Sequence, residues 1–395
     1  MDGLMTAPGV PLINREEELH WLALTLIPGL GTRVAGKLLD RFRTPQAIFR
    51  ASRTELEGAG VSGAVAQSIA SGCSFDDAVD QQQKMTDRGV TAITRNDPRY
   101  PALLREIFDP PTMLFTRGRL ELLQPFHLAV VGTRRPTPYG LAVAERLAAD
   151  MARAGLTIVS GMARGIDTAA HKGALAAGGD TVAVLGCGVD IVYPSENRKL
   201  HGDLAVKGLL ISEFAMGSTA FPQNFPIRNR IISGLSSGVL VVEGAQYSGS
   251  AITAKLAIDQ GRECFAVPGN ITSKASWGPN LLIKQGAKLV QDWNDVIVDL
   301  PAEVRRQLIE RGRARILGSP DASPQDGPAS QIGGSLPEIG RRVLAALQVD
   351  TAINLDDLLQ IVEDTSASEL IAAIFELEML GLVKQLPGKN FVKVW

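Results

Sequence analysis

Residues 128–140 read LAVVGTRRPTPYG: a short apolar run ends in a glycine and two arginines, and a helix is expected from Tyr139. The same order of apolar run, polar or glycine-rich loop and helix continues to about residue 300. Short apolar runs are typical of strands that are buried on both faces, and their alternation with helices favours a mostly parallel sheet. The sequence therefore predicts a doubly wound α/β fold for residues 73–300.

The predicted elements follow from apolar runs and from the helical spacing of apolar residues. Strands are expected at 90–94, 113–116, 128–131, 157–160, 182–185, 209–212, 239–242, 264–267 and 288–290. Helices are expected at 139–154, 167–177, 196–206, 228–235, 250–260 and 279–285. The first two strands precede the regular alternation, so we expect them at the edge of the sheet.

The loops after two central strands combine small residues with arginine. Their candidate binding residues are Gly132, Thr133, Arg134, Ser160, Gly161 and Arg164. Ligands of such sheets bind at the carboxyl ends of the strands, near the point where the strand order reverses. Small residues let a phosphate approach backbone N–H groups, and arginine can donate two hydrogen bonds to it. Asp167, at the start of the next helix, is expected to be the N-cap of that helix.

Two later segments, FPIRNRIISG at 225–234 and EGAQYSGS at 243–250, add candidates of the same kind. Together with the helix that follows, they supply Phe225, Arg228, Asn229, Arg230, Gly249, Ser250 and Lys255. The first segment falls where a loop is expected to meet a helix start, and such a junction is suited to anions. Because the cationic and small residues gather at one edge of the sheet, we predict a phosphate-rich ligand. The dinucleotide fingerprint and the Walker A lysine are both missing, and no cofactor is predicted.

Several ordered motifs of this region resemble the DNA processing protein A family (DprA, also called Smf). They are GTR at 132–134, SGMARGID at 160–167, Tyr193-Pro194 with Asn197, FPIRNRIISG at 225–234, EGAQYSGSAITA at 243–254 and GRECFAVPGN at 261–270. YPALLREIFDPP at 100–111 is similar to the family's lead-in to its extended Rossmann domain. The resemblance implies an extended Rossmann-like sheet in which the candidate residues given above line a DNA pocket.

The resemblance also implies a biological role. It would make this a homodimeric, non-enzymatic protein that binds and protects single-stranded DNA and loads the RecA recombinase onto it during natural transformation. Few aromatic residues accompany the arginines, chiefly Phe225, Tyr139 and Tyr247. We therefore expect the affinity to come mainly from phosphates, with little preference among bases.

Two other classes of function remain open. The central domain also resembles nucleoside monophosphate phosphoribohydrolases, which place a catalytic glutamate at a comparable sheet edge. Here the loop at 248–255 contains no carboxylate, and Glu243, which precedes it, is expected to be a structural acceptor. His127, His171 and His201 are scattered along the chain, so neither a catalytic triad nor a metal site is predicted. A scaffold that only binds partner proteins is the other alternative, and the convergent arginines disfavour it.

Residues 1–72 are predicted to form a small helical, SAM-like domain of the helix-hairpin-helix type. Helical spacing of apolar residues flanks PGLG at 28–31, and a weaker copy of the pattern surrounds GVSG at 60–63. In such hairpins the backbone N–H groups of the glycine turn can contact a DNA phosphate. A role only in packing or partner binding is the alternative.

The C-terminal part is predicted to contain a linker and a second small domain. Residues 301–335 hold a basic tail and then a serine-, proline- and glycine-rich stretch, which is typical of a flexible linker. Residues 336–395 resemble a winged helix-turn-helix. Its second helix, expected at 367–380, carries three glutamates and no lysine or arginine, so we expect a protein contact or a regulatory role there rather than DNA reading. Lysines in the wing argue for DNA binding instead.

The composition is that of an ordinary soluble protein, with 45% hydrophobic and 21% charged residues. A net charge of -2 argues against a protein that coats nucleic acid with its whole surface. The three cysteines form no C-x-x-C pair, which indicates thiols in a reducing compartment. No secretion signal and no apolar run of the ~20 residues needed to span a bilayer is present, so we expect a cytoplasmic protein without membrane contact.

Overall fold

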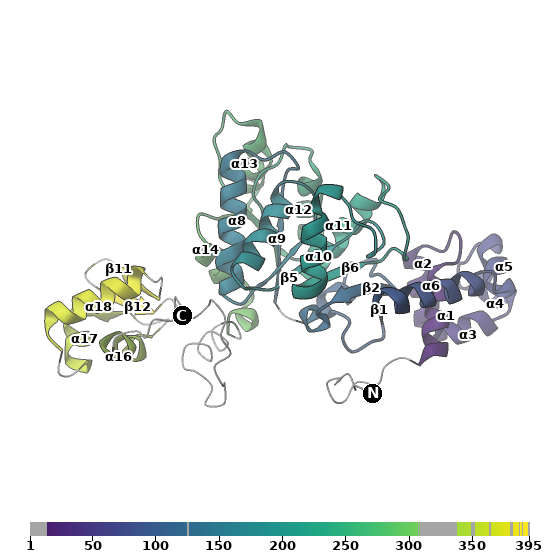
Figure 1. The fold of residues 1–395 in the computed structure, drawn as a ribbon, viewed down its shortest axis with the longest axis horizontal. Coiled ribbons are helices and arrows are strands. Elements are labelled where there is room, and N and C mark those ends of the chain that lie inside the picture. The colour runs from purple at the N-terminus through teal and green to yellow at the C-terminus, as the bar shows by residue number, and fades with distance from the viewer. Residues whose placement is uncertain are drawn as a thin grey trace. The chain divides into compact units, whose positions relative to one another are not determined.

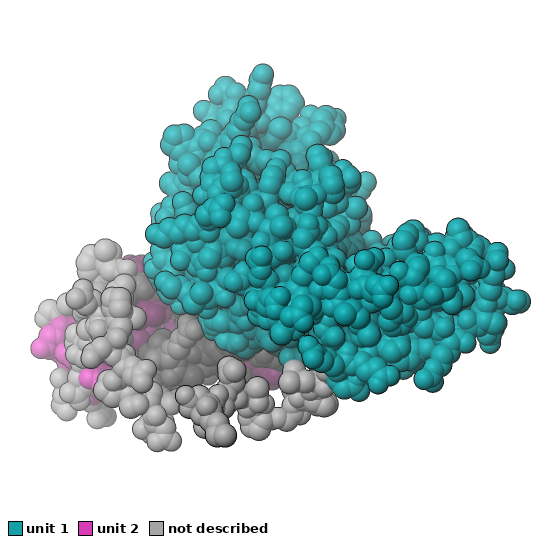
Figure 2. Space-filling model, turned by 45° about the vertical axis from the view of Figure 1, so that its right-hand side comes forward, with its two compact units in different colours: residues 1–305 teal, residues 306–395 magenta. Residues whose placement is uncertain are grey.

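The computed structural model describes residues 14–124, 126–306, 308, 338–348, 352–362, 365–379, 382–386, 388 and 390–393. The chain divides into two compact units, residues 1–305 and 306–395, which are teal and magenta in Figure 2. Each unit has its own apolar core.

The first unit begins with a group of helices. They are α1 (Arg15–Thr25), α2 (Thr32–Phe42), α3 (Pro45–Arg50), α4 (Arg53–Gly58), α5 (Gly63–Ser71) and α6 (Phe75–Arg88). Glycine-containing turns join α1 to α2 and α4 to α5, as the sequence predicts. The side chain of Ser74, just before α6, donates a hydrogen bond of 2.8 Å to the carbonyl of Ala23 in α1. One apolar core contains Trp21 and Leu38 of these helices together with Leu210 of the sheet, so the boundary at residue 72 stays a prediction.

The sheet of this unit has the strand order β1-β2-β6-β5-β4-β3-β7-β8-β9. Its strands are β1 (Thr91–Thr94), β2 (Met113–Gly118), β3 (His127–Val131), β4 (Thr157–Ser160), β5 (Thr181–Val184), β6 (Leu209–Ser212), β7 (Gly238–Val241), β8 (Glu263–Ala266) and β9 (Lys288–Leu289). The strands from β3 to β9 pair in parallel. β1 and β2 are antiparallel edge strands. The predicted mostly parallel sheet is therefore confirmed.

Helices cover both faces of the sheet. They are α7 (Ala102–Arg105), α8 (Pro138–Arg153), α9 (Ile166–Ala176), α10 (Arg198–Lys207), α11 (Asn224–Leu235), α12 (Gly249–Asp259), α13 (Trp277–Lys284) and α14 (Trp293–Val298). Alternate residues of β5 enter different cores: Ala183 packs in the cluster that contains Leu204 of α10, whereas Val182 and Val184 pack with Ile231 of α11. Helices α8 and α9 lie side by side (Figure 1). The doubly wound architecture predicted from the sequence is confirmed.

The strand order reverses between β3 and β7. From β3 the chain adds β4, β5 and β6 on one side, and it then returns through α11 to place β7 on the other side of β3. The loops that leave β3 and β7 therefore lead to opposite sides of the sheet, and a crevice opens between them at the carboxyl ends of the strands.

The largest difference from the predicted elements concerns α11. The sequence predicts a helix from residue 228, whereas α11 begins at Asn224. Pro226 lies in the first turn of the helix, where a proline is tolerated because the N–H groups of that turn have no intrahelical acceptor. Arg228 and Arg230 consequently lie beyond the first turn of the helix, and the prediction of a loop that meets a helix start at Arg228 is wrong.

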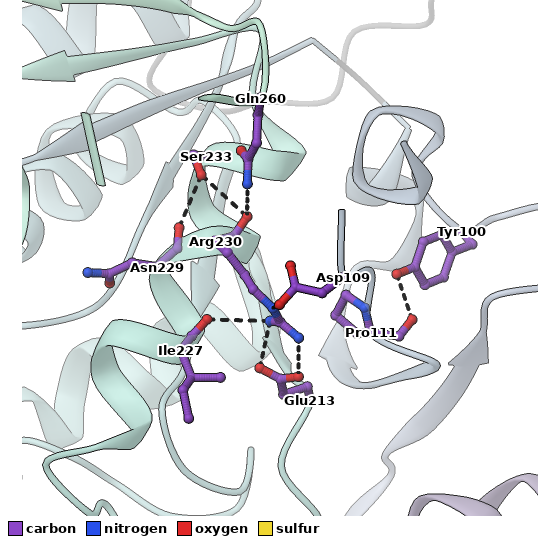
Figure 3. A network of polar contacts seen from close by, with 9 residues as sticks. All are labelled: Tyr100, Asp109, Pro111, Glu213, Ile227, Asn229, Arg230, Ser233 and Gln260. Carbon is purple, nitrogen blue, oxygen red and sulfur yellow. Dashed lines mark hydrogen bonds and ion pairs between the residues drawn. The ribbon is translucent and has the colours of Figure 1, made fainter. Parts of the chain in front are cut away.

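Arg230 is the centre of a buried ionic network that ties α11 to two other segments (Figure 3). Its guanidinium donates two hydrogen bonds, of 2.8 and 2.7 Å, to the carboxylate of Glu213, which follows β6. Its Nε donates a third, of 3.0 Å, to Asp109, which precedes β2. The side chains of Arg230 and Glu213 are only 7% and 8% exposed. Burial raises the pKa of Glu213, and the charge of Arg230 opposes that rise.

The second unit contains a small antiparallel sheet and helices. Its elements are α16 (Glu338–Ala346), β10 (Ile353–Asn354), α17 (Leu355–Ile361), α18 (Ala367–Met379), β11 (Val383–Leu386) and β12 (Asn390–Lys393), with the strand order β10-β12-β11. Val343, Leu358, Leu370 and Leu377 are fully buried in its core. Two helices followed by a two-stranded wing match the predicted winged helix-turn-helix.

The predicted cationic features of the C-terminal part are only partly described. Residues 309–337, which include most of the basic tail and the linker, lie outside the described residues, and so does Lys389 of the wing. Lys393 donates a hydrogen bond of 3.0 Å to the carbonyl of Leu344, while Lys384 is exposed. Within the described ranges, no helix combines the length and the apolar character needed to cross a bilayer.

The Arg230 network predicts a stability effect. Arg230→Ala leaves the Glu213 carboxylate buried without its partner, and such a change typically costs about 3–5 kcal/mol. Chemical denaturation followed by circular dichroism should show this loss of unfolding free energy. Arg164→Ala, which breaks an exposed ion pair with Glu196, is the matched control and should leave the midpoint unchanged. Arg230→Met should lose stability in the same way, and adding Glu213→Leu to it should recover most of the loss. Equal loss in Arg230→Met and in the double variant would contradict the unpaired carboxylate as the cause, and no loss in Arg230→Ala would contradict a structural role.

Candidate nucleic-acid interface

A pocket of about 420 Å³ opens at the carboxyl ends of β3, β4 and β7, where the strand order reverses. Loop residues after these strands and residues of α9, α11 and α12 form its wall. The lining residues are Val131, Gly132, Thr133, Arg134, Ala163, Asp167, Tyr193, Ala220, Pro222, Phe225, Pro226, Arg228, Asn229, Ile232, Ser248, Gly249, Ser250, Ile252 and Thr253.

Arg228 is a buried cation in this lining. Its side chain comes from α11, the residue is 3% exposed, and its Nη1 donates hydrogen bonds to the carbonyls of Gly161, after β4, and Val184, in β5. Burial lowers the pKa of Arg228 to about 10, so the guanidinium remains charged at neutral pH. Gly161 makes this position possible, since a Cβ there would collide with the Arg228 guanidinium.

Asp167 is a buried anion in the same lining. The predicted N-cap role is wrong, because Gly165 occupies that position of α9. Instead, its Oδ2 accepts hydrogen bonds from the backbone N–H groups of Gly161 and Ala163, at 3.2 and 3.3 Å, and so holds the loop after β4. Burial raises the pKa of Asp167, and the charge of Arg228 opposes that rise. We call Arg228 and Asp167 the pocket floor.

The N-terminus of α12 contributes polar groups to the opposite wall. Ser248 is the N-cap and accepts a hydrogen bond from the N–H of Ala251 at 3.3 Å. Gly249 and Ser250 open the helix, so their N–H groups have no intrahelical acceptor. Asn229 of α11 donates a hydrogen bond to the carbonyl of Gly249 at 3.4 Å. A helix N-terminus beside the exposed side chain of Arg134 is suited to an anion.

Aromatic side chains lie beside these charged groups. The Phe225 ring is 5.3 Å from the Tyr193 ring, and the Arg134 guanidinium lies over Phe225 at 5.3 Å. Tyr193 is 40% exposed. The sequence prediction included Phe225 but used Tyr193 only as part of a motif. An aromatic residue in a loop that follows a parallel strand was the signal that could have identified it.

The structure brings together most of the predicted site residues. Gly132, Thr133, Arg134, Phe225, Arg228, Asn229, Gly249 and Ser250 all line the pocket. Five predicted residues do not line it: Ser160, Gly161, Arg164, Arg230 and Lys255.

Each of these five residues has another position or partner. The Ser160 hydroxyl donates to the Val130 carbonyl inside the sheet at 2.7 Å. Arg164 pairs with Glu196 at the surface, and Lys255 is exposed further along α12. Arg230 faces away because residues two positions apart on a helix differ by roughly 200° around its axis. We therefore leave Ser160, Arg164, Arg230 and Lys255 out of the site, and Gly161 supports it through Arg228.

Glu243 has the structural role that the sequence predicts. Its carboxylate accepts hydrogen bonds from the N–H and the hydroxyl of Thr137, at 2.9 and 2.6 Å, at the N-terminus of α8. The residue is 2% exposed and does not line the pocket. A carboxylate held in this way stabilises the start of a helix.

The family model described as DNA recombination-mediator protein A matches residues 91–301. A second model, the DprA winged helix domain, matches residues 327–389. The chain is 32% identical over 400 residues to Protein Smf of Synechocystis sp., and the match covers 95% of this chain and 98% of that protein.

Two solved structures are similar to this one. The X-ray structure of DNA processing protein A from Streptococcus pneumoniae has a TM-score of 0.65 and 35% identity, over 74% of this chain and 99% of that one. A structure that addresses the single-stranded DNA binding mode of the Helicobacter pylori protein has a TM-score of 0.49 and 30% identity, over 56% and 96% of the two chains. Because one family model spans more than half of the sequence and a relative aligns over nearly all of it, the chain belongs to the DNA processing protein A (DprA/Smf) family.

Proposed function

We propose that the pocket binds single-stranded DNA, with phosphates held at the α12 N-terminus and by Arg134. The observation that carries the proposal is the meeting of a helix N-terminus, two arginines and two aromatic rings in one pocket at the strand-order reversal. Helix N-terminal N–H groups and arginine bind phosphate. Aromatic rings stack with unpaired bases of any sequence.

A single strand fits this arrangement better than a duplex. In a duplex the bases are stacked and paired, and their faces are not available to protein rings, whereas an extended single strand exposes each base. Around the pocket, Phe221, Ile252 and Tyr247 are 55%, 45% and 91% exposed. Such apolar groups next to a phosphate site are suited to the unstacked bases of a single strand.

We further propose that the protein holds this strand without altering it and delivers it to a recombinase. Membership of a family described by recombination mediation supports this role. The resemblance extends it to protection of incoming DNA and loading of RecA during natural transformation, by a homodimer in the cytoplasm. The winged helix domain is then free to contact a protein partner, as its acidic second helix suggests.

The alternative of a nucleotide-acting enzyme has one observation in its favour. Among the described residues that line the pocket, Asp167 carries a carboxylate. Its Oδ2 is engaged by two backbone N–H groups, and the other candidate carboxylate, Glu243, is held by Thr137 outside the lining. We therefore favour binding without chemistry.

Arg134 and its neighbour Arg135 allow a matched test. Both are exposed, but only Arg134 lines the pocket. Arg134→Ala should weaken binding of an oligonucleotide roughly tenfold for every sequence and reduce the salt slope by about one unit, because one phosphate contact is lost. Fluorescence anisotropy at several salt concentrations measures both. Arg135→Ala should change binding much less, and equal effects of the two changes would argue against a phosphate contact at Arg134.

Two substitutions at Gly249 test the effect of a negative charge at the α12 N-terminus, because their side chains have the same size and differ in charge. A Cβ at Gly249 meets no atom within 4 Å, so a side chain fits there without disturbing the fold. Gly249→Asp places a carboxylate at the α12 N-terminus, where it competes with phosphate and should reduce single-strand affinity by about tenfold or more. Gly249→Asn has the same shape without the charge and should bind nearly as well as the wild type. If the two variants bind alike, the helix N-terminus does not hold phosphate.

The enzyme alternative can be tested directly. Incubation of the purified protein with each nucleoside monophosphate should release no free base, as measured by liquid chromatography. Release that disappears in Asp167→Asn would contradict the binding proposal and establish a hydrolase.

A further inference from the structure

Within the described ranges, the pocket floor presents one unengaged acceptor, the Oδ1 of Asp167, and two unengaged donor groups, the Nε and Nη2 of Arg228. The Asp167 residue is 6% exposed and Arg228 is 3% exposed, and both line the pocket. Asp167 uses Oδ2 to hold the backbone of Gly161 and Ala163, and its Oδ1 has no partner among the described residues. Arg228 uses Nη1 for two carbonyls, and its Nη2 likewise has no partner in the described part of the chain.

This floor does not suit a phosphate. A phosphate close to Arg228 would also lie close to the Asp167 carboxylate, and repulsion between like charges is strong where water is excluded. The charge of Asp167 also acts on Arg134, but less than on Arg228, and Arg134 is exposed, so solvent screens the repulsion of a phosphate there. We therefore expect the phosphates of a DNA strand at Arg134 and the α12 N-terminus. The floor suits a neutral group that carries both hydrogen-bond donors and acceptors.

We propose that the floor receives a nucleobase of the bound strand and favours guanine. This inference rests on the proposed function, since it takes single-stranded DNA as the ligand. A single nucleobase is a small ligand, and the pocket volume of about 420 Å³ is within the range of small-ligand sites. A base that enters the pocket meets the Phe225 ring, and its polar edge meets Arg228 and Asp167, which line the same space.

Guanine fits because of its hydrogen-bonding edge. Its N1–H and N2–H groups are adjacent donors that converge on one carboxylate oxygen, and its O6 accepts from an arginine N–H. In adenine and cytosine the amino group lies beside a ring acceptor, which Asp167 repels. In thymine the single N3–H lies between two carbonyls. Buried polar groups that find no partner in the wrong ligand give strong discrimination.

The test uses the wild-type protein and a nine-residue oligo-dT whose central position is varied. By fluorescence anisotropy, central guanine should bind about tenfold more tightly than central thymine, cytosine or adenine. Inosine, which lacks the N2 amino group, should lose most of this gain. 7-Deazaguanine, which keeps both donors, should retain it.

The outcomes separate the two proposals. Equal binding of all four bases would overturn the guanine site and leave single-strand binding intact, whereas no binding of any oligonucleotide would overturn both. Equal binding of inosine and guanine, or loss of binding with 7-deazaguanine, would also overturn the two-donor contact.

A variant gives an independent check. Asp167→Asn keeps one oxygen for the N–H groups of Gly161 and Ala163 and replaces the free oxygen by an amino group, which cannot accept from guanine. The tenfold preference for guanine should disappear, and the ratio of the affinities for central guanine and central thymine is the readout. Loss of the charge beside the buried Arg228 should lower the melting temperature and affect both oligonucleotides equally. A variant that folds and retains the preference would show that Asp167 does not read the base. If the variant does not fold, the base series with the wild-type protein decides the matter.

Discussion

The candidate site depends on the burial of one guanidinium. Arg228 extends from α11 to the carboxyl ends of two neighbouring strands, where it donates to the carbonyls of Gly161 and Val184. The charge of Asp167 acts on Arg228 without a hydrogen bond between the two side chains. Two carbonyl dipoles and the nearby charge of Asp167 therefore offset the cost of removing the cation from water. These contacts fix α11 against the sheet and set the depth of the pocket.

The two arginines of α11 have different surroundings: one is part of an ionic network and the other lines the candidate pocket. Arg230 is paired with Glu213 and Asp109 and ties α11 to the ends of β6 and to the segment before β2 (Figure 3). Arg228 faces the pocket on the other side of the same helix. A helix anchored on both sides is a rigid wall, which favours a binding site that is already formed before the ligand arrives. Arg134 and the α12 N-terminus, which we propose to bind phosphate, are the more exposed part of the pocket.

The sequence was sufficient for the architecture because strands buried on both faces leave a strong signal. Runs such as Ile158-Val159 in β4 are short and apolar, and polar or glycine residues follow them. The edge strands β1 and β2 were also identified. The start of α11 was not, since a proline in the first turn resembles a loop when neighbours in space are unknown. The predicted helix at 228–235 already contained Arg228 and Arg230, but both were assigned to the binding site, whereas helical geometry places them on nearly opposite faces.

By itself, the sequence determined the doubly wound sheet, the edge at which the site lies, the winged helix and the family, because these follow from local periodicity and from motifs that are contiguous in the chain. The tertiary structure alone decided which charges face the candidate pocket. Ser160, Arg164 and Arg230 find protein partners that are up to 121 positions away in the sequence, while Asp167 is turned from a helix cap into part of the pocket floor. Such pairings depend on distances across the fold, and no pattern along the chain encodes them.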